Sequence, residues 1–371
     1  MEKNPYEIDF EEYIREGEPD KKEKSIAWSI AIGLQQVDGL KPSSYLYETA
    51  KKNIEGELSF DEAKNLIDSY YESRTARNQD DERTEEADKV SSRIAQILSE
   101  PSFNFSPSHL IAIHKRLFEG IFKFAGKIRD YDITKKEWIL NGDTVMYAGA
   151  GEIADALNYY FSKEKNFDYS KLSKEDVVKY LTRFVADIWQ IHPFGEGNTR
   201  TIAVFTIKYL HSLGFIVNKE PFKKHSWYFR NALVRANYTN MQKGIYMNTE
   251  YLEKFFRNIL LGENNELKNR YNHIDYDEYM KKLGENKKSS EKNNPINDTA
   301  KITQKITVKI TVNQQKIIDV IKENPFITQE ELSKIVGIAR LNINKNMKKL
   351  QELGIIKRVG ADKNGHWEVI E

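Results

Sequence analysis

Apolar residues recur at helical spacing along most of this chain. In the first segment they fall at Ile26, Ile30, Leu34 and Val37, and Asp38-Gly39 followed by Pro42 predicts where that helix ends. A second helix is expected after Pro42, and the capping-box pattern Ser59-Phe-Asp-Glu62 predicts the start of a third. Because short helices bury little surface alone, we expect residues 1–75 to dock on a larger part of the chain.

The central segment, residues 87–272, is predicted to be a helical core. One of its helices opens at Ser106-Pro107, and another covers Thr201 to Leu213 and is apolar on most sides, as buried helices are. A β-hairpin is predicted around Asn141-Gly142, the dipeptide preferred in tight hairpin turns. The charged stretch from Asn78 to Glu86 is the expected boundary before this core.

The C-terminal part is predicted to be a linker over residues 283–312 and a winged helix-turn-helix over residues 313–371. Helices are expected around Ile317, after the capping box at Thr328, and from Leu341 to Leu353, followed by two wing strands at 355–359 and 366–370. A basic patch typical of DNA binding lies on the predicted recognition helix, at Arg340, Lys345, Lys348 and Lys349. A solvated face or a protein-docking module is the alternative.

Composition narrows the class of protein. The chain has 57 Lys and Arg against 56 Asp and Glu, so any attraction to nucleic acid must come from a local patch. The absence of cysteine excludes disulfides, thiolate metal sites and cysteine nucleophiles. The N-terminus does not resemble a signal peptide and no apolar run reaches membrane-spanning length, so we expect a cytoplasmic protein without a membrane partner.

The chemically distinctive segment runs from His192 to Arg200, between two predicted buried helices. Its glycines let backbone N–H groups approach a ligand closely, and the following helix directs its free N–H groups into the same loop, which favours an anion. Asn198 adds an amide, and Arg200 adds a forked cation that suits phosphate oxygens. Glu196 beside an anion site indicates Mg²⁺, and His192 could take a proton from an attacking hydroxyl.

Each of these features alone has a structural explanation. A histidine after an apolar helix is usually structural, and a Gly-x-Gly loop is more often a turn than a phosphate cradle. Their ordered combination between two buried helices favours a nucleotide site. By contrast, Gly149-Ala-Gly151 predicts only a turn, and four histidines without companion groups are interpreted as packing or surface residues: His109, His114, His211 and His225.

The segment from His192 to Arg200 resembles the signature of the Fic family, His-Pro-Phe-x-(Asp/Glu)-Gly-Asn-Gly-Arg-x-x-Arg. The resemblance covers roughly Ala87 to Gly262 and includes Phe124-Ala-Gly-Lys-Ile-Arg129 and the helix Trp227 to Tyr238. It implies a Fic-type helical core in which His192 is the general base and Glu196 the Mg²⁺ ligand. It also implies a nucleotide-binding loop with Gly197, Asn198 and nearby amides on the α-phosphate and Arg200 on the β-phosphate; Gly195 and Thr199 belong to this loop.

The resemblance further implies that the hairpin, about Glu137 to Tyr147, is a flap that clamps the target segment by strand addition. Its predicted contact residues are Trp138, Ile139, Leu140, Thr144, Val145 and Met146. Two positions depart from the family pattern: Thr199 replaces its third glycine, and Ala203 replaces its second arginine, which handles the γ-phosphate. Chemistry at the α-phosphate does not need that arginine, so activity is still expected. In the phosphate-transferring Doc branch of the family, a lysine stands where this chain has Thr199. This difference argues against membership of that branch.

The first segment resembles an antitoxin of the VbhA type fused to its Fic partner. The inhibitory motif of that family is Ser/Thr-x-x-x-Glu-Gly/Asn, and the matching residues are Leu34, Asp38 and Gly39. Leu34 replaces the hydroxyl residue and Asp38 the glutamate, whose usual arginine partner is Ala203 here. The alternative is that Asp38-Gly39 is only a helix stop.

The function expected from this resemblance is protein nucleotidyl transfer, most simply adenylyl transfer with Mg²⁺ as cofactor and ATP as substrate. The acceptor would be a Tyr, Thr or Ser hydroxyl of a target protein, with hydroxyls of the chain itself among the candidates. Two alternatives remain: a DNA-binding regulator whose Fic core is a catalytically silent sensor, and a phosphotransferase. The expected fold class is mainly α, with a small hairpin flap and a C-terminal winged helix.

Overall fold

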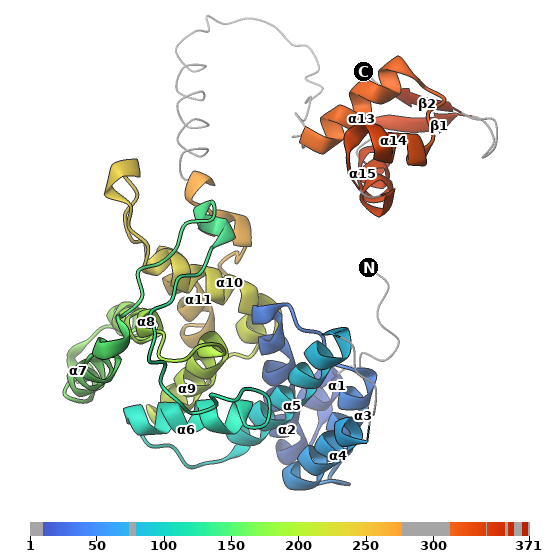
Figure 1. The fold of residues 1–371 in the computed structure, drawn as a ribbon. Helices are drawn as coiled ribbons and strands as arrows, with labels where there is room; N and C mark the ends of the chain where they lie inside the picture. Colours follow the sequence, from blue (N-terminus) through green and yellow to red (C-terminus); the bar gives the residue numbers. More distant parts are fainter. Residues whose placement is uncertain are drawn as a thin grey trace, which may run out of the picture. The chain divides into compact units, whose positions relative to one another are not determined.

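The computed structural model describes residues 10–73, 79–276, 312–338, 340–352, 355–359 and 366–369. The chain divides into two compact units, Met1–Asn293 and Asn294–Glu371, which are described separately. Both are built mainly from helices, which confirms the expected fold class (Figure 1). Among the described residues, no helix is both long and apolar enough to cross a lipid bilayer.

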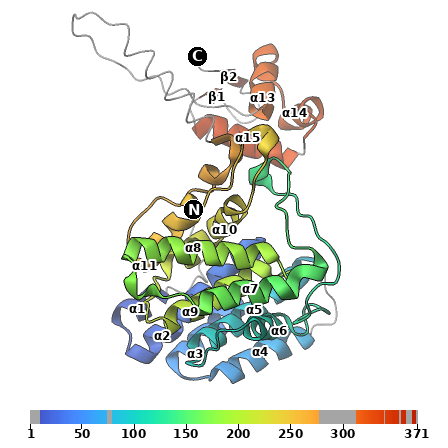
Figure 2. The same cartoon turned by 90° about the vertical axis from the view of Figure 1, so that its left-hand side faces the viewer.

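The first unit is a helical assembly around one hydrophobic core. Its α-helices are α1 (Phe10–Glu16), α2 (Pro19–Leu34), α3 (Ser44–Glu55), α4 (Phe60–Glu72), α5 (Gln79–Ser99), α6 (Pro107–Phe118), α7 (Ile153–Lys165), α8 (Lys174–Ile191), α9 (Asn198–Ser212), α10 (Glu220–Ala236) and α11 (Glu250–Leu260). The predicted caps are present: Ser59 and Glu62 form the capping box of α4, and Ser106 caps α6 with Pro107 in its first turn. Helices α7 and α8 lie side by side in both views (Figures 1 and 2).

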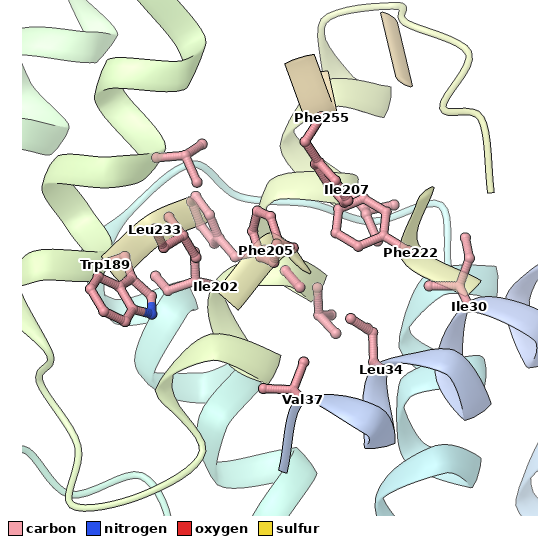
Figure 3. Packing of buried hydrophobic residues seen from close by; sticks show 14 of the residues in the cluster. Ile30, Leu34, Val37, Trp189, Ile202, Phe205, Ile207, Phe222, Leu233 and Phe255 are labelled. Carbon is pink, nitrogen blue, oxygen red and sulfur yellow. The ribbon is translucent and has the colours of Figure 1, made fainter. Parts of the chain in front are cut away.

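The N-terminal helices dock on the core, as their limited surface requires. Helix α2 packs mainly against α5 and α10, and its buried residues belong to the same cluster as the central helices. Figure 3 shows Ile30, Leu34 and Val37 facing the cluster that contains Phe205 and Phe222. A Cβ atom on Gly33 would lie 2.5 Å from the Cα of Lys223, so α2 approaches α10 as closely as a glycine allows.

The stretch predicted as a boundary, from Asn78 to Glu86, lies at the start of α5, which begins at Gln79 and continues without interruption into the core. The charged residues occupy the first turns of that helix, where acidic side chains are favoured by the helix dipole. The following positions Val90 and Ile94 are completely buried and anchor α5 in the core.

The predicted β-hairpin is also wrong. Asn141 and Gly142 do adopt left-handed backbone angles, with φ of 57° and 86°, but residues 133–147 form no strand. Trp138–Leu140 is instead a 3₁₀ turn, and the Glu137 N–H donates to the Asp143 carbonyl at 2.9 Å. Ile139 and Leu140 are consecutive and both buried, whereas a hairpin strand with one face in solvent would bury only every second residue.

The second unit is a winged helix-turn-helix. It contains α13 (Val312–Glu323), α14 (Gln329–Val336), α15 (Arg340–Glu352) and the antiparallel strands β1 (Ile356–Val359) and β2 (His366–Val369), with Ile356 opposite Val369. The predicted capping box at Thr328 is present, and its small core includes Ile317, Leu332 and Ile343. The predicted linker, residues 283–312, lies outside the described residues except for Val312, which opens α13.

Candidate active site

His192 occupies the residue position where α8 ends. Its backbone is left-handed, with φ of 49° and ψ of 61°, a conformation that is costly for a residue other than glycine. Arg129 holds this turn: its Nε donates to the His192 carbonyl at 2.8 Å, and its backbone N–H donates to the Pro193 carbonyl at 2.9 Å. The turn therefore places the imidazole between the last turn of α8 and the loop that precedes α9.

The imidazole of His192 is buried and neutral. Its ring lies 4.3 Å from the Tyr147 ring and 5.1 Å from the Trp189 ring, measured between centroids. Nδ1 lies 3.3 Å from the Trp189 carbonyl, which can only accept, so Nδ1 carries the proton and Nε2 keeps a lone pair. Burial, and then the charge of Lys135, hold the pKa of His192 well below its ordinary value. The ring is thus neutral, with its lone pair on Nε2.

The loop between α8 and α9 ends in an anion-binding geometry. Gly197, with φ of 77°, is the N-cap of α9, so the first N–H groups of that helix have no partners within it. A Cβ on Gly197 would lie 2.3 Å from the Phe118 ring. The Asn198 side chain closes the loop by accepting from the Phe194 N–H at 3.0 Å and donating to the Phe194 carbonyl at 2.7 Å. Its side chain is therefore engaged with protein, and the backbone N–H groups are what the loop offers an anion.

Thr199 has a structural contact that a glycine at this position would lack. Its Oγ1 accepts a hydrogen bond from the Trp189 indole at 3.0 Å, which ties the first turn of α9 to the last turn of α8. The departure from the family signature at Thr199 therefore reinforces the loop. The neighbouring Gly195 lies against the Tyr131 hydroxyl and the Phe124 ring, where a Cβ would approach that hydroxyl to 2.6 Å.

Glu196 extends from this loop toward solvent, with 55% of its side chain exposed. The Nζ of Lys135 lies 3.1 Å from both carboxylate oxygens. The Glu196 carbonyl accepts from Nε2 of His114 at 3.0 Å, while Nδ1 of His114 accepts from the Gly126 N–H at 2.9 Å. The His114 ring also stacks on the Phe194 ring, with 3.7 Å between centroids. The prediction that His114 lacks companion groups is therefore wrong, because its two hydrogen bonds hold the loop in place.

Arg200 is almost completely buried and is surrounded by acceptors. Its Nε lies 2.9 Å from the Asp38 carboxylate, Nη2 donates to Glu86 at 2.5 Å, and Nη1 donates to Gln35 at 3.1 Å. Asp38 therefore forms an ion pair with Arg200, although the arginine that usually pairs with this position is Ala203 here. Two of the three partners, Gln35 and Asp38, come from the short 3₁₀ helix Gln35–Asp38 that follows α2.

The other two residues of the predicted inhibitory motif act through the fold. Leu34 is fully buried in the core, and Gly39 ends the 3₁₀ helix with φ of 66°. Arg83 of α5 donates to the carbonyl of Asp38 at 3.0 Å and fixes this turn in place. Of the three, Asp38 alone brings a charged group to the loop between α8 and α9.

Two connected spaces meet at the loop. A cavity of about 30 Å³ lies against His192 and is closed by Asp38, Lys135 and Arg230. It has room for water but for no larger ligand. A groove of about 420 Å³ adjoins it and shares Asp38, Glu196 and Arg230; its other walls are Val37, Gly39, Leu40, Arg83, Glu86, Phe122, Arg200 and Trp227.

The predicted flap residues divide into two groups. Ile139, Leu140 and Val145 are buried and anchor the segment, whereas Trp138 and Met146 are exposed, Met146 at 84%. Thr144 accepts from the Lys135 N–H at 3.1 Å, and Gln190 of α8 donates to the Met146 carbonyl at 3.0 Å. The segment is held against the site as an irregular loop.

Four residues that shape the site were not predicted to do so: Glu86, His114, Lys135 and Arg230. Tyr147, at the end of the predicted flap, also lies against His192. Each comes from an element outside the signature, and pairs such as Lys135 and Glu196 are 61 positions apart. The acidic run before position 87 contains Glu86, and the predicted helix Trp227 to Tyr238 contains Arg230, but neither pattern distinguishes the residue from its neighbours.

The predicted basic patch of the winged helix lies on one exposed face of α15. Arg340, Lys345, Lys348 and Lys349 are all exposed, while Ile343, Met347 and Leu350 of the same helix are buried in the core of the second unit. The four cations are therefore available to a partner.

Comparison with known proteins gives two matches to families. Residues 104–210 match the Fic/DOC family, and residues 311–357 match the winged helix-turn-helix DNA-binding family. The chain is 26% identical over 155 residues to a probable protein adenylyltransferase, y4lH, of Sinorhizobium fredii, covering 39% of this chain and 71% of that protein. It is 25% identical over 150 residues to the protein adenylyltransferase VbhT of Bartonella schoenbuchensis, covering 37% of this chain and 30% of that protein.

Among solved structures, the chain is similar to BepC, a VirB-translocated effector of Bartonella tribocorum crystallised with bound AMPPNP. The identity is 19% and the TM-score 0.40, over 52% of this chain and 90% of that one. The residues from His192 to Arg200 lie inside the matched family region, and the basic face of α15 lies inside the second. The chain thus carries a Fic/DOC family domain over residues 104–210 and a C-terminal winged helix-turn-helix domain.

Proposed function

We propose that this chain is a protein adenylyltransferase, which transfers AMP from ATP to a Tyr, Thr or Ser hydroxyl of a protein, with its own hydroxyls among the candidates. The observation that carries the proposal is the placement of a neutral, buried His192 beside the N-terminus of α9. A proton acceptor and an anion site then lie in one loop. Relatives named as protein adenylyltransferases support the same assignment.

In the proposed reaction the target hydroxyl oxygen forms a bond to the α-phosphorus, and the bond from that phosphorus to the bridging oxygen of the β-phosphate breaks. The hydroxyl proton passes to Nε2 of His192, and pyrophosphate leaves. The N–H groups at the start of α9 and the loop glycines stabilise the charge on the α-phosphate. Arg200, once free of its carboxylate partners, would bind the β-phosphate.

Glu196 is the residue that would hold Mg²⁺. It is a solvent-accessible carboxylate at the junction of the cavity and the groove. The described residues contain no cluster of three or more His, Asp or Glu side chains suited to a metal. A single carboxylate fits Mg²⁺ bound jointly with phosphate oxygens, as is common for this ion. When bound, Mg²⁺ would neutralise phosphate charge, and Lys135 would yield its place on Glu196.

We also propose that the N-terminal helices restrain the enzyme. Asp38 and Gln35 occupy the guanidinium of Arg200, and Asp38 helps to reduce the space at His192 to the size of a water molecule. A nucleotide cannot place its phosphates productively until the 3₁₀ helix withdraws. This is the role of a fused antitoxin of the VbhA type.

The winged helix provides a second candidate activity, DNA binding. The exposed cations of α15 and the family match support it. It is compatible with adenylyl transfer, but it would be the main function if the Fic core is a silent sensor.

ATP labelled at different phosphates distinguishes the three functions. The purified chain with Mg²⁺ and α-labelled ATP should retain label on protein, whereas γ-labelled ATP should not. Transfer of the γ label would indicate phosphotransfer. Transfer of neither label, with or without residues 1–74, would favour the silent regulator.

A further inference from the structure

Position 203 is an alanine and offers no positive charge to the terminal phosphate of a nucleoside triphosphate. Ala203 is fully buried in α9, and it lines neither the cavity at His192 nor the adjoining groove. If the chain binds nucleotides as proposed above, its terminal phosphate must meet another positive group.

Arg230 of α10 is placed to supply that group. It is the one arginine that lines both the small cavity and the groove, beside Glu196 in each. Its Nη1 and Nη2 donate to the two oxygens of Glu137 at 2.7 and 2.9 Å, and its guanidinium lies 5.3 Å from the Trp227 ring centroid. Because the paired Glu137 is 1% exposed, the guanidinium is held in one orientation.

This pairing leaves part of the guanidinium available. A bidentate contact uses one N–H of each terminal nitrogen, so the remaining N–H donors of Arg230 are open to a ligand in the groove. The groove contains groups that suit a nucleotide, because Arg230 lies in its wall with the aromatic rings of Phe122 and Trp227. Two of its carboxylates, Asp38 and Glu86, are paired with Arg200. Its volume of about 420 Å³ is within the range of small-molecule sites.

We propose that Arg230 binds the terminal phosphate of the nucleoside triphosphate, in place of the cation that position 203 lacks. Glu137 is then a positioning residue, which fixes the guanidinium without touching the substrate. This inference rests on the proposed nucleotide-transferring function, and it identifies the residue that selects a triphosphate over a diphosphate.

The test is the affinity of the full-length protein for AMP, ADP and ATP with Mg²⁺, measured by calorimetry. Removing Arg230 alone would leave the buried carboxylate of Glu137 without its partner and would destabilise the fold. The informative variant is therefore the double change Arg230→Gln with Glu137→Gln, which removes both charges. Glu137→Gln alone is the matched control that retains the cation, and thermal unfolding checks that each variant is folded.

We expect the wild type and Glu137→Gln to bind ATP more tightly than ADP. The double variant should lose roughly tenfold to hundredfold in ATP affinity, keep its AMP affinity, and bind ATP and ADP about equally. An unchanged preference for ATP over ADP in the double variant would overturn the inference. An equal loss of affinity for all three nucleotides would overturn it too, because Arg230 would then have only a structural role. A chain that binds none of the three, with or without residues 1–74, would instead reject the proposed function.

Discussion

The proposed chemistry depends on one residue, His192, and on its neutral imidazole. Its proton position follows from the Trp189 carbonyl at Nδ1, and its neutrality follows from burial and from nearby positive charge. Both conditions leave Nε2 free to receive a proton at physiological pH.

Replacing His192 with alanine should reduce transfer by roughly a hundred- to ten-thousand-fold, because positioned base catalysis contributes about that much. Nucleotide affinity should change little, since the anion site consists of backbone N–H groups. His211→Ala, at an exposed position of α9, is the matched control. Because the pKa of His192 lies below its ordinary 6.5, the wild-type rate should not decline between pH 8 and pH 6.5. A decline centred on 6.5 that His192→Ala abolishes would contradict this account.

His114 should make the free energy of unfolding depend on pH. Burial lowers its pKa to about 4 in the folded state, against 6.5 when unfolded. Between these two pH values the unfolded chain binds a proton that the folded chain does not. The contribution of neutral His114 to the free energy of unfolding is therefore complete above pH 6.5 and is lost as the pH falls toward 4. The loss is about 1.4 kcal/mol per pH unit, or about 2 kcal/mol at pH 5.

Urea unfolding of the wild type and His114→Gln at pH 7.5 and pH 5 measures this effect. The stability advantage of the wild type should shrink by about 2 kcal/mol at the lower pH. An advantage that is the same at both pH values would show that His114 is protonated in the folded protein.

At the scale of elements, the proposed restraint depends on the contact between α2 and α10. Arg200 is held by Gln35 and Glu86 as well as by Asp38. Loss of the Asp38 carboxylate alone therefore leaves two acceptors in place, and the docked helix still fills the space beside the loop.

Deletion of residues 1–74 should accordingly raise transfer more than Asp38→Ala does. The deletion should also lower the unfolding temperature, because it exposes the apolar surface that α2 covers. The measurement is label transfer from α-labelled ATP by the wild type and both variants. Equal activation by the two would mean that one carboxylate carries the whole restraint.

Gly33→Val gives the same test without removing any chain. Its side chain would collide with the Lys223 backbone, where a Cβ alone comes within 2.5 Å, and should separate α2 from α10. Lys22→Ala, at an exposed position of α2, is the control. We expect activation by Gly33→Val and none by Lys22→Ala.

The elements also show which features a sequence pattern can predict. Capping boxes at Ser59 and Thr328 depend on residues three positions apart, and both predictions were confirmed. The hairpin prediction failed although Asn141 and Gly142 form the expected turn, because Ile139 and Leu140 are both buried in the core and the chain before the turn forms a 3₁₀ helix. The contact of Arg230 with Glu137 spans 93 positions and depends on how α10 packs, so no local pattern predicts it.

At the scale of the whole molecule, the chain combines a Fic/DOC domain with a winged helix in a separate compact unit. The overall charge is close to balanced, so the exposed cations of α15 are a local feature. Such a patch binds DNA by releasing counterions, which makes affinity strongly dependent on salt.

Duplex binding by the full-length protein should therefore weaken steeply as salt rises. Changing Lys345, Lys348 and Lys349 together to alanine should reduce both the affinity and the salt slope, while leaving adenylyl transfer unchanged. Fluorescence anisotropy across a salt series makes the comparison. Negligible affinity of the wild type at low salt would remove DNA from its partners.

The most direct test of the account is the intact mass of protein after incubation with Mg²⁺ and ATP. The Gly33→Val chain, released from its N-terminal restraint, should gain a mass equal to AMP on itself or on an added protein acceptor. The same chain carrying His192→Ala should gain none. An increment equal to a phosphate group, or an AMP increment that survives the loss of His192, would contradict adenylyl transfer by the His192 loop.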